Sequence, residues 1–181
     1  MAILPPEKLV PVAEFDAYLM DPTPFAWGDL LAPFSPPLPR EGQVILASFF
    51  GDVFVEDRDG AVWWVNGLES RVDRIAINRD KALERIGAEH LAMLKTKLLE
   101  QMIRGDRLLP AGKVYGLKLS RAEGGKYHPD NLGTAPMADA FAFMGDQFRA
   151  KNTPQPSAPE AAAAVPAPEK QKKSGFWGKK S

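Results

Sequence analysis

The sequence contains no cysteine, carries no net charge and has no long apolar run. The absence of cysteine excludes a disulfide scaffold, a thiolate zinc site and a cysteine nucleophile. The 23 basic and 23 acidic residues cancel, and a polybasic nucleic-acid binder needs a sustained positive field instead. No segment approaches the roughly 18 apolar residues of a membrane-spanning helix. We therefore expect a cytoplasmic protein that does not bind nucleic acid directly.

Proline divides the chain into three parts. Residues 1–40 hold nine of the 17 prolines, so we expect a segment that wraps around a folded body. Residues 41–150 hold only three and should form that body. Residues 151–181 are rich in Pro and Ala and have few large apolar side chains, so they cannot bury enough surface to offset their ordering entropy. This tail is predicted to be a disordered linker that ends in a basic, aromatic peptide.

The zero net charge is a cancellation between two of these parts. The tail 151–181 carries six Lys and two Glu, whereas residues 1–150 carry 17 basic and 21 acidic residues. The predicted body is thus acidic and the predicted tail is basic. An acidic body suits a basic protein partner.

The hydrophobic pattern predicts an α+β fold. Short β-rich runs within about 43–77, and another at about 113–119, indicate a small antiparallel sheet. An apolar stripe at three- and four-residue steps predicts one long helix over about 79–104, with Asn78 as its N-cap. A second helix is predicted over about 137–149. The two tryptophans at 63 and 64 interrupt the alternation of their strand, so we expect both faces of that strand to be covered.

No motif for catalysis is visible. His90 and His128 are the only histidines, and neither has a partner at metal-ligand spacing. The serines lack the context of a nucleophile elbow. We therefore expect no catalytic residue, no metal and no cofactor. An enzyme that uses His128 with an acidic residue is the weakest alternative.

An acidic cluster surrounds one predicted hairpin. It forms either a negative patch for a basic partner or a solvated hairpin with an Asp-rich turn, because Asp favours turns through local hydrogen bonds. A calcium loop is excluded, because the segment is too short for the required ligand spacing. The cluster consists of Asp52, Glu56, Asp57, Asp59, Glu69 and Asp73.

The C-terminal peptide pairs two aromatic residues with lysines on both sides. Three interpretations stay open: a weak tether to an anionic membrane surface, a docking motif for a partner protein, and a solubilising tail without a further role. The residues of this predicted contact are Lys172, Lys173, Phe176, Trp177, Lys179 and Lys180.

The order of motifs between Ser48 and Arg149 resembles a known bacterial family. The first motif is FFGDVFVEDRDGAVWWVN, and the second is KVYGLKL followed by EGGKYHPDNLG. Both resemble signatures of the immunity-protein domain of type VI secretion systems, which is related to immunity proteins against DNase toxins and often follows a GAD-like domain. The matching residues are Gly51, Asp52, Gly60, Trp64, Tyr115, Gly116, Gly124, Gly125, Tyr127, Asn131 and Leu132.

This resemblance implies a non-enzymatic antitoxin that binds and neutralises a cognate secreted toxin, with a nuclease as one toxin class. We expect the contact surface to combine the acidic cluster with the loop at 122–133, where Tyr127, His128 and Asp130 lie. The alternative is a cytoplasmic interaction or scaffold protein that its C-terminal peptide tethers to a membrane or partner.

Overall fold

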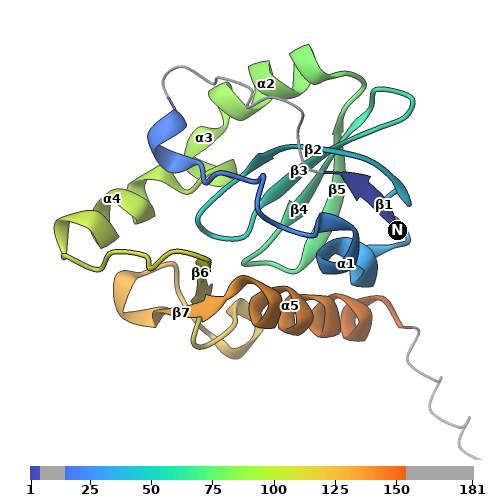
Figure 1. Ribbon diagram of the computed structural model, residues 1–181. Coiled ribbons are helices and arrows are strands. Elements are labelled where there is room, and N and C mark those ends of the chain that lie inside the picture. Colours follow the sequence, from blue (N-terminus) through green and yellow to red (C-terminus); the bar gives the residue numbers. More distant parts are fainter. Residues whose placement is uncertain (5–14, 154–181) are drawn as a thin grey trace, which may run out of the picture.

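A computed structural model describes residues 1–4 and 15–153 of the chain (Figure 1). Its centre is a five-stranded sheet with the order β1-β2-β3-β4-β5. Strand β1 pairs with β2 in parallel, and the remaining neighbours are antiparallel. The strands are β1 (Ala2–Leu4), β2 (Glu41–Ala47), β3 (Val53–Asp57), β4 (Val62–Asn66) and β5 (Arg71–Ala76). The predicted α+β class is confirmed.

Helices cover both faces of this sheet. On one face, α1 (Trp27–Leu31) and α5 (Met137–Asn152) share a core with β2, β3 and β4. On the other face, α2 (Arg79–Ala88) and α3 (His90–Met93) form a second core. Successive residues of a strand point to opposite faces, so Trp63 packs against the first core and Trp64 lies in the second. The prediction that both faces of this strand are covered is confirmed.

A two-stranded ribbon lies beside the end of the main sheet (Figure 1). It pairs β6 (Lys113–Leu117) with β7 (Leu132–Pro136). We predicted that 113–119 belongs to the sheet of 43–77, but the structure places it in this separate ribbon. One backbone bond, from Tyr115 N to Phe49 O (2.9 Å), connects the ribbon to the chain before β3. The ribbon and α4 (Thr96–Arg104) enclose a third core.

The predicted long helix over 79–104 is wrong, because this segment forms three helices, α2, α3 and α4. The first break is at Glu89, and the second is at Lys95, whose φ of 53° lies in the left-handed region. Lys95 is only 5% exposed because its ammonium group turns inward to Asp52. The predicted N-cap is confirmed, since Lys81 N donates to Asn78 Oδ1 at 2.9 Å.

Four short 3-10 helices complete the secondary structure of the described residues, and two of them shape the loop between β6 and β7. These helices are η1 (Asp16–Tyr18), η2 (Ala32–Phe34), η3 (Arg121–Glu123) and η4 (Pro129–Asn131). Over residues 1–4 and 15–153, no helix is long and apolar enough to cross a membrane. The predicted disordered tail and its six contact residues lie almost wholly in 154–181, outside the described residues.

Candidate functional site

Asp52 lies at the start of β3 and joins three segments of the chain. Its carboxylate accepts hydrogen bonds from Ser48 Oγ (2.7 Å), from Gly67 N (3.2 Å) and from Trp64 Nε1 (3.4 Å). Lys95 Nζ lies 2.8 Å from each of its two oxygens. The Asp52 side chain is fully buried, so a partner protein cannot reach it. This corrects the expectation that Asp52 belongs to an exposed contact surface.

The tip of the β3–β4 hairpin is held by local hydrogen bonds of Asp57. Its carboxylate accepts from Asp59 N (3.0 Å), from Ala61 N (2.9 Å) and from Trp63 Nε1 (2.9 Å). This geometry is that of an Asp-rich turn. Asp59 itself is exposed at the tip.

Glu56 and Asp73 each form an ion pair with a neighbouring arginine. Arg79, at the start of α2, donates to Glu56. Arg71 Nε lies 2.7 Å from Asp73 Oδ2 on the exposed surface of β5. Both carboxylates are therefore already compensated within the chain.

The loop between β6 and β7 is held by a dense set of polar contacts. The Asn131 side chain donates to Leu119 O (2.9 Å) and Lys126 O (3.1 Å) and accepts from Leu119 N (3.0 Å). Ser120 and Glu123 form a reciprocal capping box at the start of η3. A Cβ at Gly125 would lie 1.9 Å from Leu119 O, so only glycine fits this close approach. The sequence therefore builds a defined loop rather than a loose connection.

Tyr127 connects this loop to the turn between β4 and β5. Its hydroxyl donates to Glu69, and the guanidinium of Arg121 lies 5.2 Å from the centre of its ring. Burial raises the pKa of Tyr127, and the hydrogen bond to the Glu69 carboxylate raises it further. Tyr127 remains 40% exposed, so this residue is both held in place and accessible.

His128 and Asp130 project from the same loop. Asp130 N donates to His128 Nδ1 (3.3 Å), and Arg107 donates to the Asp130 carboxylate (2.7 Å). The hydrogen bond and charge of Arg107 lower the pKa of Asp130 below its ordinary value. The side chains of His128 and Asp130 are 63% and 72% exposed. They lie on an open surface. Among the described residues, no enclosed site surrounds His128 to support the hypothesis of an enzyme that uses this residue.

The structure thus divides the predicted contact residues between two ends of the sheet. Glu69 and the 122–133 loop lie at the end where β3 begins, whereas Asp57 and Asp59 lie where β3 ends. Five strand residues span about 16 Å. The acidic cluster is therefore not one patch, and only its Glu69 is brought to the loop by a described contact.

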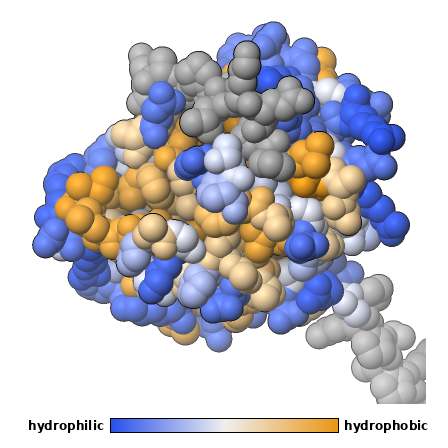
Figure 2. All heavy atoms as spheres, viewed as in Figure 1, coloured by the Kyte–Doolittle hydropathy of each residue, from blue (hydrophilic) through white to orange (hydrophobic). Residues whose placement is uncertain are grey.

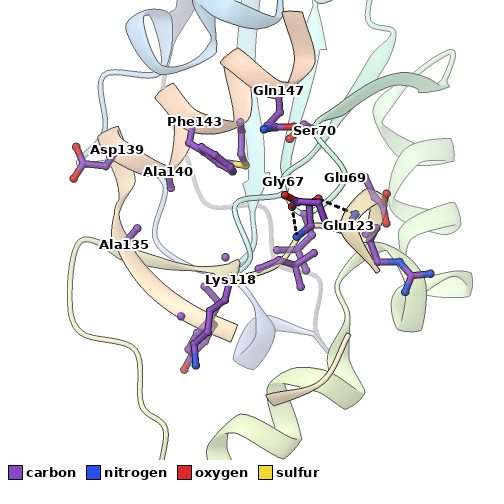
Figure 3. A pocket seen from close by; sticks show the side chains of 18 of the residues that line it. Gly67, Glu69, Ser70, Lys118, Glu123, Ala135, Asp139, Ala140, Phe143 and Gln147 are labelled. Carbon is purple, nitrogen blue, oxygen red and sulfur yellow. Dashed lines mark hydrogen bonds between the residues drawn. The ribbon is translucent and has the colours of Figure 1, made fainter. Parts of the chain in front are cut away.

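An apolar pocket beside this loop was not predicted. It encloses about 400 Å³ between α5, the β6–β7 ribbon and the turn at 67–70 (Figure 3). Its lining includes Leu68, Tyr115, Leu117, Ala140, Phe143 and Met144. The sequence holds one signal for it: Phe141 and Phe143 lie two positions apart in a helix and so cannot both face the same core.

A second, more polar pocket of about 640 Å³ lies on the other side of Glu69. Trp64 and the buried Lys95 contribute to its lining, together with Tyr127, Arg71 and Arg85. Lys95 Nζ and the Arg71 guanidinium lie 5.7 Å and 5.9 Å from the centre of the Trp64 ring. Lys95 forms an ion pair with Asp52, and Arg71 forms one with Asp73.

Another apolar surface follows the end of α4. Figure 2 shows hydrophobic side chains gathered there, on the face seen in Figure 1. Ile103 and Leu108 are 52% and 66% exposed. Neither residue contributes to the two pockets above.

No group of three or more His, Cys, Asp or Glu side chains that could hold a metal ion occurs within the described part of the chain. Comparisons with protein-family models, with curated proteins and with solved structures found no match. The resemblance to the immunity-protein family therefore stays a prediction.

Proposed function

We propose that this chain is a non-enzymatic immunity protein that binds a cognate secreted bacterial toxin in the cytoplasm and neutralises it. The sequence motifs support this class of protein, and the nuclease toxins of the resembled family are the first toxin class to test. The contact surface we propose is the loop between β6 and β7, at 118–131, together with Glu69.

The observation that carries the proposal is a loop that is both exposed and held in one conformation. Asn131, the Ser120–Glu123 capping box and the Tyr127–Glu69 bond fix it from three sides. Ordering a flexible loop on binding costs free energy, and a loop that is already ordered avoids that cost. Binding residues are commonly placed on loops that a rigid scaffold positions.

The residues of the family resemblance divide into two roles in this arrangement. Tyr115 and Leu132 are buried in the third core, and Gly125 permits the close approach to Leu119. These residues build the loop. Tyr127, by contrast, is accessible, and in the proposal it contacts the toxin directly with its neighbour His128.

The net charge of the body supports a basic partner, whereas the loop with Glu69 is itself balanced, with Lys118, Arg121 and Lys126 against Glu69, Glu123 and Asp130. The body at 1–150 carries 17 basic and 21 acidic residues. Glu69 has no ion-pair partner among the described residues, and Asp130 is highly exposed beside Arg107. Electrostatic complementarity of this kind speeds encounter and selects partners. A toxin that itself binds a polyanionic substrate would present the required positive surface.

Binding to a toxin encoded by a neighbouring gene would test the proposal. The chain and an inactivated toxin are co-purified, and protection is measured as growth when the active toxin is expressed. We expect Tyr127→Ala with His128→Ala to weaken binding by about tenfold or more, as for central interface residues. Asp59→Ala, at the exposed hairpin tip, is the matched control and should change binding by less than about twofold.

Two outcomes would count against the proposal in different ways. Absence of both binding and protection with every toxin encoded nearby would remove the immunity function. Loss of binding in the Asp59 variant, with the loop variant unaffected, would move the contact surface to the hairpin. The alternative scaffold function depends on the C-terminal peptide, which lies outside the described residues.

A further inference from the structure

The apolar pocket beside α5 has an exposed aromatic wall. Phe143 is 59% exposed although it lies beside buried residues, among them Met144 and Tyr115. In Figure 3, Phe143 and Asp139 from α5 lie on one side of the pocket, and Gly67, Glu69 and Glu123 lie on the other. The volume of about 400 Å³ is in the range of about 300–1,000 Å³ that holds compact apolar ligands. The pocket suits one or two aromatic side chains.

The described part of the chain ends beside this pocket. Helix α5 contributes Asp139, Phe143, Gln147 and Lys151 to the lining, and it ends at Asn152. The sequence that follows, 154–181, is therefore attached next to the pocket. Along this remaining sequence, Phe176 and Trp177 are the only aromatic residues.

The intervening sequence is long enough for the distance to be bridged. The pocket wall on α5, from Asp139 to Lys151, extends about 18 Å at the helical rise. A proline-rich chain of 22 residues, the length of 154–175, reaches up to about 68 Å at about 3.1 Å per residue. Because the linker can span the wall, docking is intramolecular, with an effective concentration of up to about millimolar. Even a weak contact is then substantially occupied.

The charges at the rim complement the flanks of the peptide. Glu69, Glu123 and Asp139 surround the pocket, and within the described residues none of the three forms an ion pair. The rim also holds three basic residues, and each donates to a carbonyl group: Lys118 to Asp130 O, Arg121 to Gly125 O and Lys151 to Glu69 O. The flanking lysines of the peptide are Lys172, Lys173, Lys179 and Lys180.

We propose that the C-terminal peptide docks in cis into this pocket, with Phe176 and Trp177 against Phe143 and the flanking lysines beside the three carboxylates. The basic tail and the acidic body of one chain then contact each other directly. This inference concerns the chain alone and does not depend on a toxin.

Fluorine NMR of the full chain labelled with 5-fluorotryptophan tests the proposal. The chain has four tryptophans, and Trp177→Phe assigns the resonance of Trp177 by its disappearance. A synthetic peptide with the sequence of 170–181, labelled in the same way, gives the reference position of the undocked side chain. We expect the Trp177 resonance of the full chain to be displaced from that reference.

A pair of matched variants locates the docking site. Phe143→Asp should shift the Trp177 resonance to the peptide position, because a carboxylate replaces the apolar wall. Leu108→Asp makes the same change at a residue that is 66% exposed and lies away from the pocket, and it should leave the resonance displaced. The other three tryptophan resonances report whether each variant keeps its fold.

Three results would overturn the proposal. The Trp177 resonance of the unmutated chain could coincide with the peptide position, so that no docking occurs. It could stay displaced in the Phe143→Asp chain, which would place the peptide elsewhere. A displacement that grows with protein concentration would assign the pocket to the tail of a second copy. Glu69 and Glu123 belong to both proposed surfaces. The Trp177 resonance is measured without toxin, so a failure of docking is distinguishable from a failure of toxin binding.

Discussion

Lys95 and Asp52 form a buried ion pair in which one ammonium nitrogen lies 2.8 Å from both oxygens of the carboxylate. Their side chains are 5% and 0% exposed. The pair joins the start of β3 to the junction of α3 and α4, 43 positions along the chain. It accounts for the left-handed backbone of Lys95, since the chain must turn sharply there to direct the side chain inward.

Breaking this pair from one side should strongly destabilise the fold. Asp52→Asn leaves the Lys95 charge buried without its counterion, and we expect the free energy of unfolding to fall by about 3–5 kcal/mol. Urea unfolding measures the change. Arg104→Met removes one partner of the exposed Arg104–Glu100 pair and should cost less than about 1 kcal/mol.

A double variant measures the interaction energy between Asp52 and Lys95 apart from the contacts of each residue with its other neighbours. Asp52→Asn with Lys95→Met removes both charges, so its loss should be smaller than the sum of the two single losses. Additive losses would contradict a direct energetic coupling between the two side chains.

The same pair shows where the sequence could predict the fold and where it could not. Strands β2 to β5 and the cap at Asn78 depend on local patterns and were predicted correctly, whereas β1 and β7 were not predicted. The break at Lys95 depends on a partner 43 positions away, and the helical stripe continues through it. The pairing of β1 with β2 is equally non-local. Local propensity carries no information about such contacts.

The candidate site follows the same division. The sequence singled out Tyr127 and His128 as accessible loop residues, and the structure places them on an exposed loop. The sequence prediction also grouped Asp52 with Asp59, although Asp52 is buried and Asp59 lies at the hairpin tip. Successive side chains of a strand point to opposite faces of the sheet, and the strand advances with each residue. Residues that are close in sequence therefore need not form one surface patch. The pocket beside α5 joins segments far apart in the chain.

Gly125 should be essential for the conformation of the β6–β7 loop. Gly125→Ala would bring a Cβ to 1.9 Å from Leu119 O and 2.8 Å from Asn131 Nδ2, so the loop must move. We expect faster exchange of the amide hydrogens at positions 119 and 125. In the unmutated loop, Leu119 N donates to Asn131 Oδ1 and Gly125 N donates to Ser120 O. Gly116→Ala is the control, because a Cβ there meets no atom within 4 Å. Equal exchange in the two variants would contradict the role of Gly125.

The contact between Arg107 and Asp130 should depend on pH. Hydrogen bonding and charge from Arg107 lower the pKa of Asp130 below its ordinary value of 3.8. The stabilisation that this carboxylate gives to the loop is therefore present above pH 3.8 and is lost as the pH falls through the lower pKa of the folded state. Carboxyl-carbon NMR measures the titration directly. Arg107→Gln should raise the pKa of Asp130 toward 3.8, and an unchanged titration would contradict the assignment.

Two phenylalanines of α5 should differ sharply in their contribution to stability. Phe141 is 1% exposed and its ring contacts those of Trp27 and Phe34, so it ties α5 to the segment before β2. Phe141→Ala should lower the free energy of unfolding by about 3–5 kcal/mol. Phe143 is 59% exposed, and Phe143→Ala should change it by less than about 0.5 kcal/mol. Urea unfolding of both variants provides the comparison. A large loss of unfolding free energy for Phe143→Ala would show that this side chain contributes to the core. The ring would then not be free to contact a ligand in the pocket.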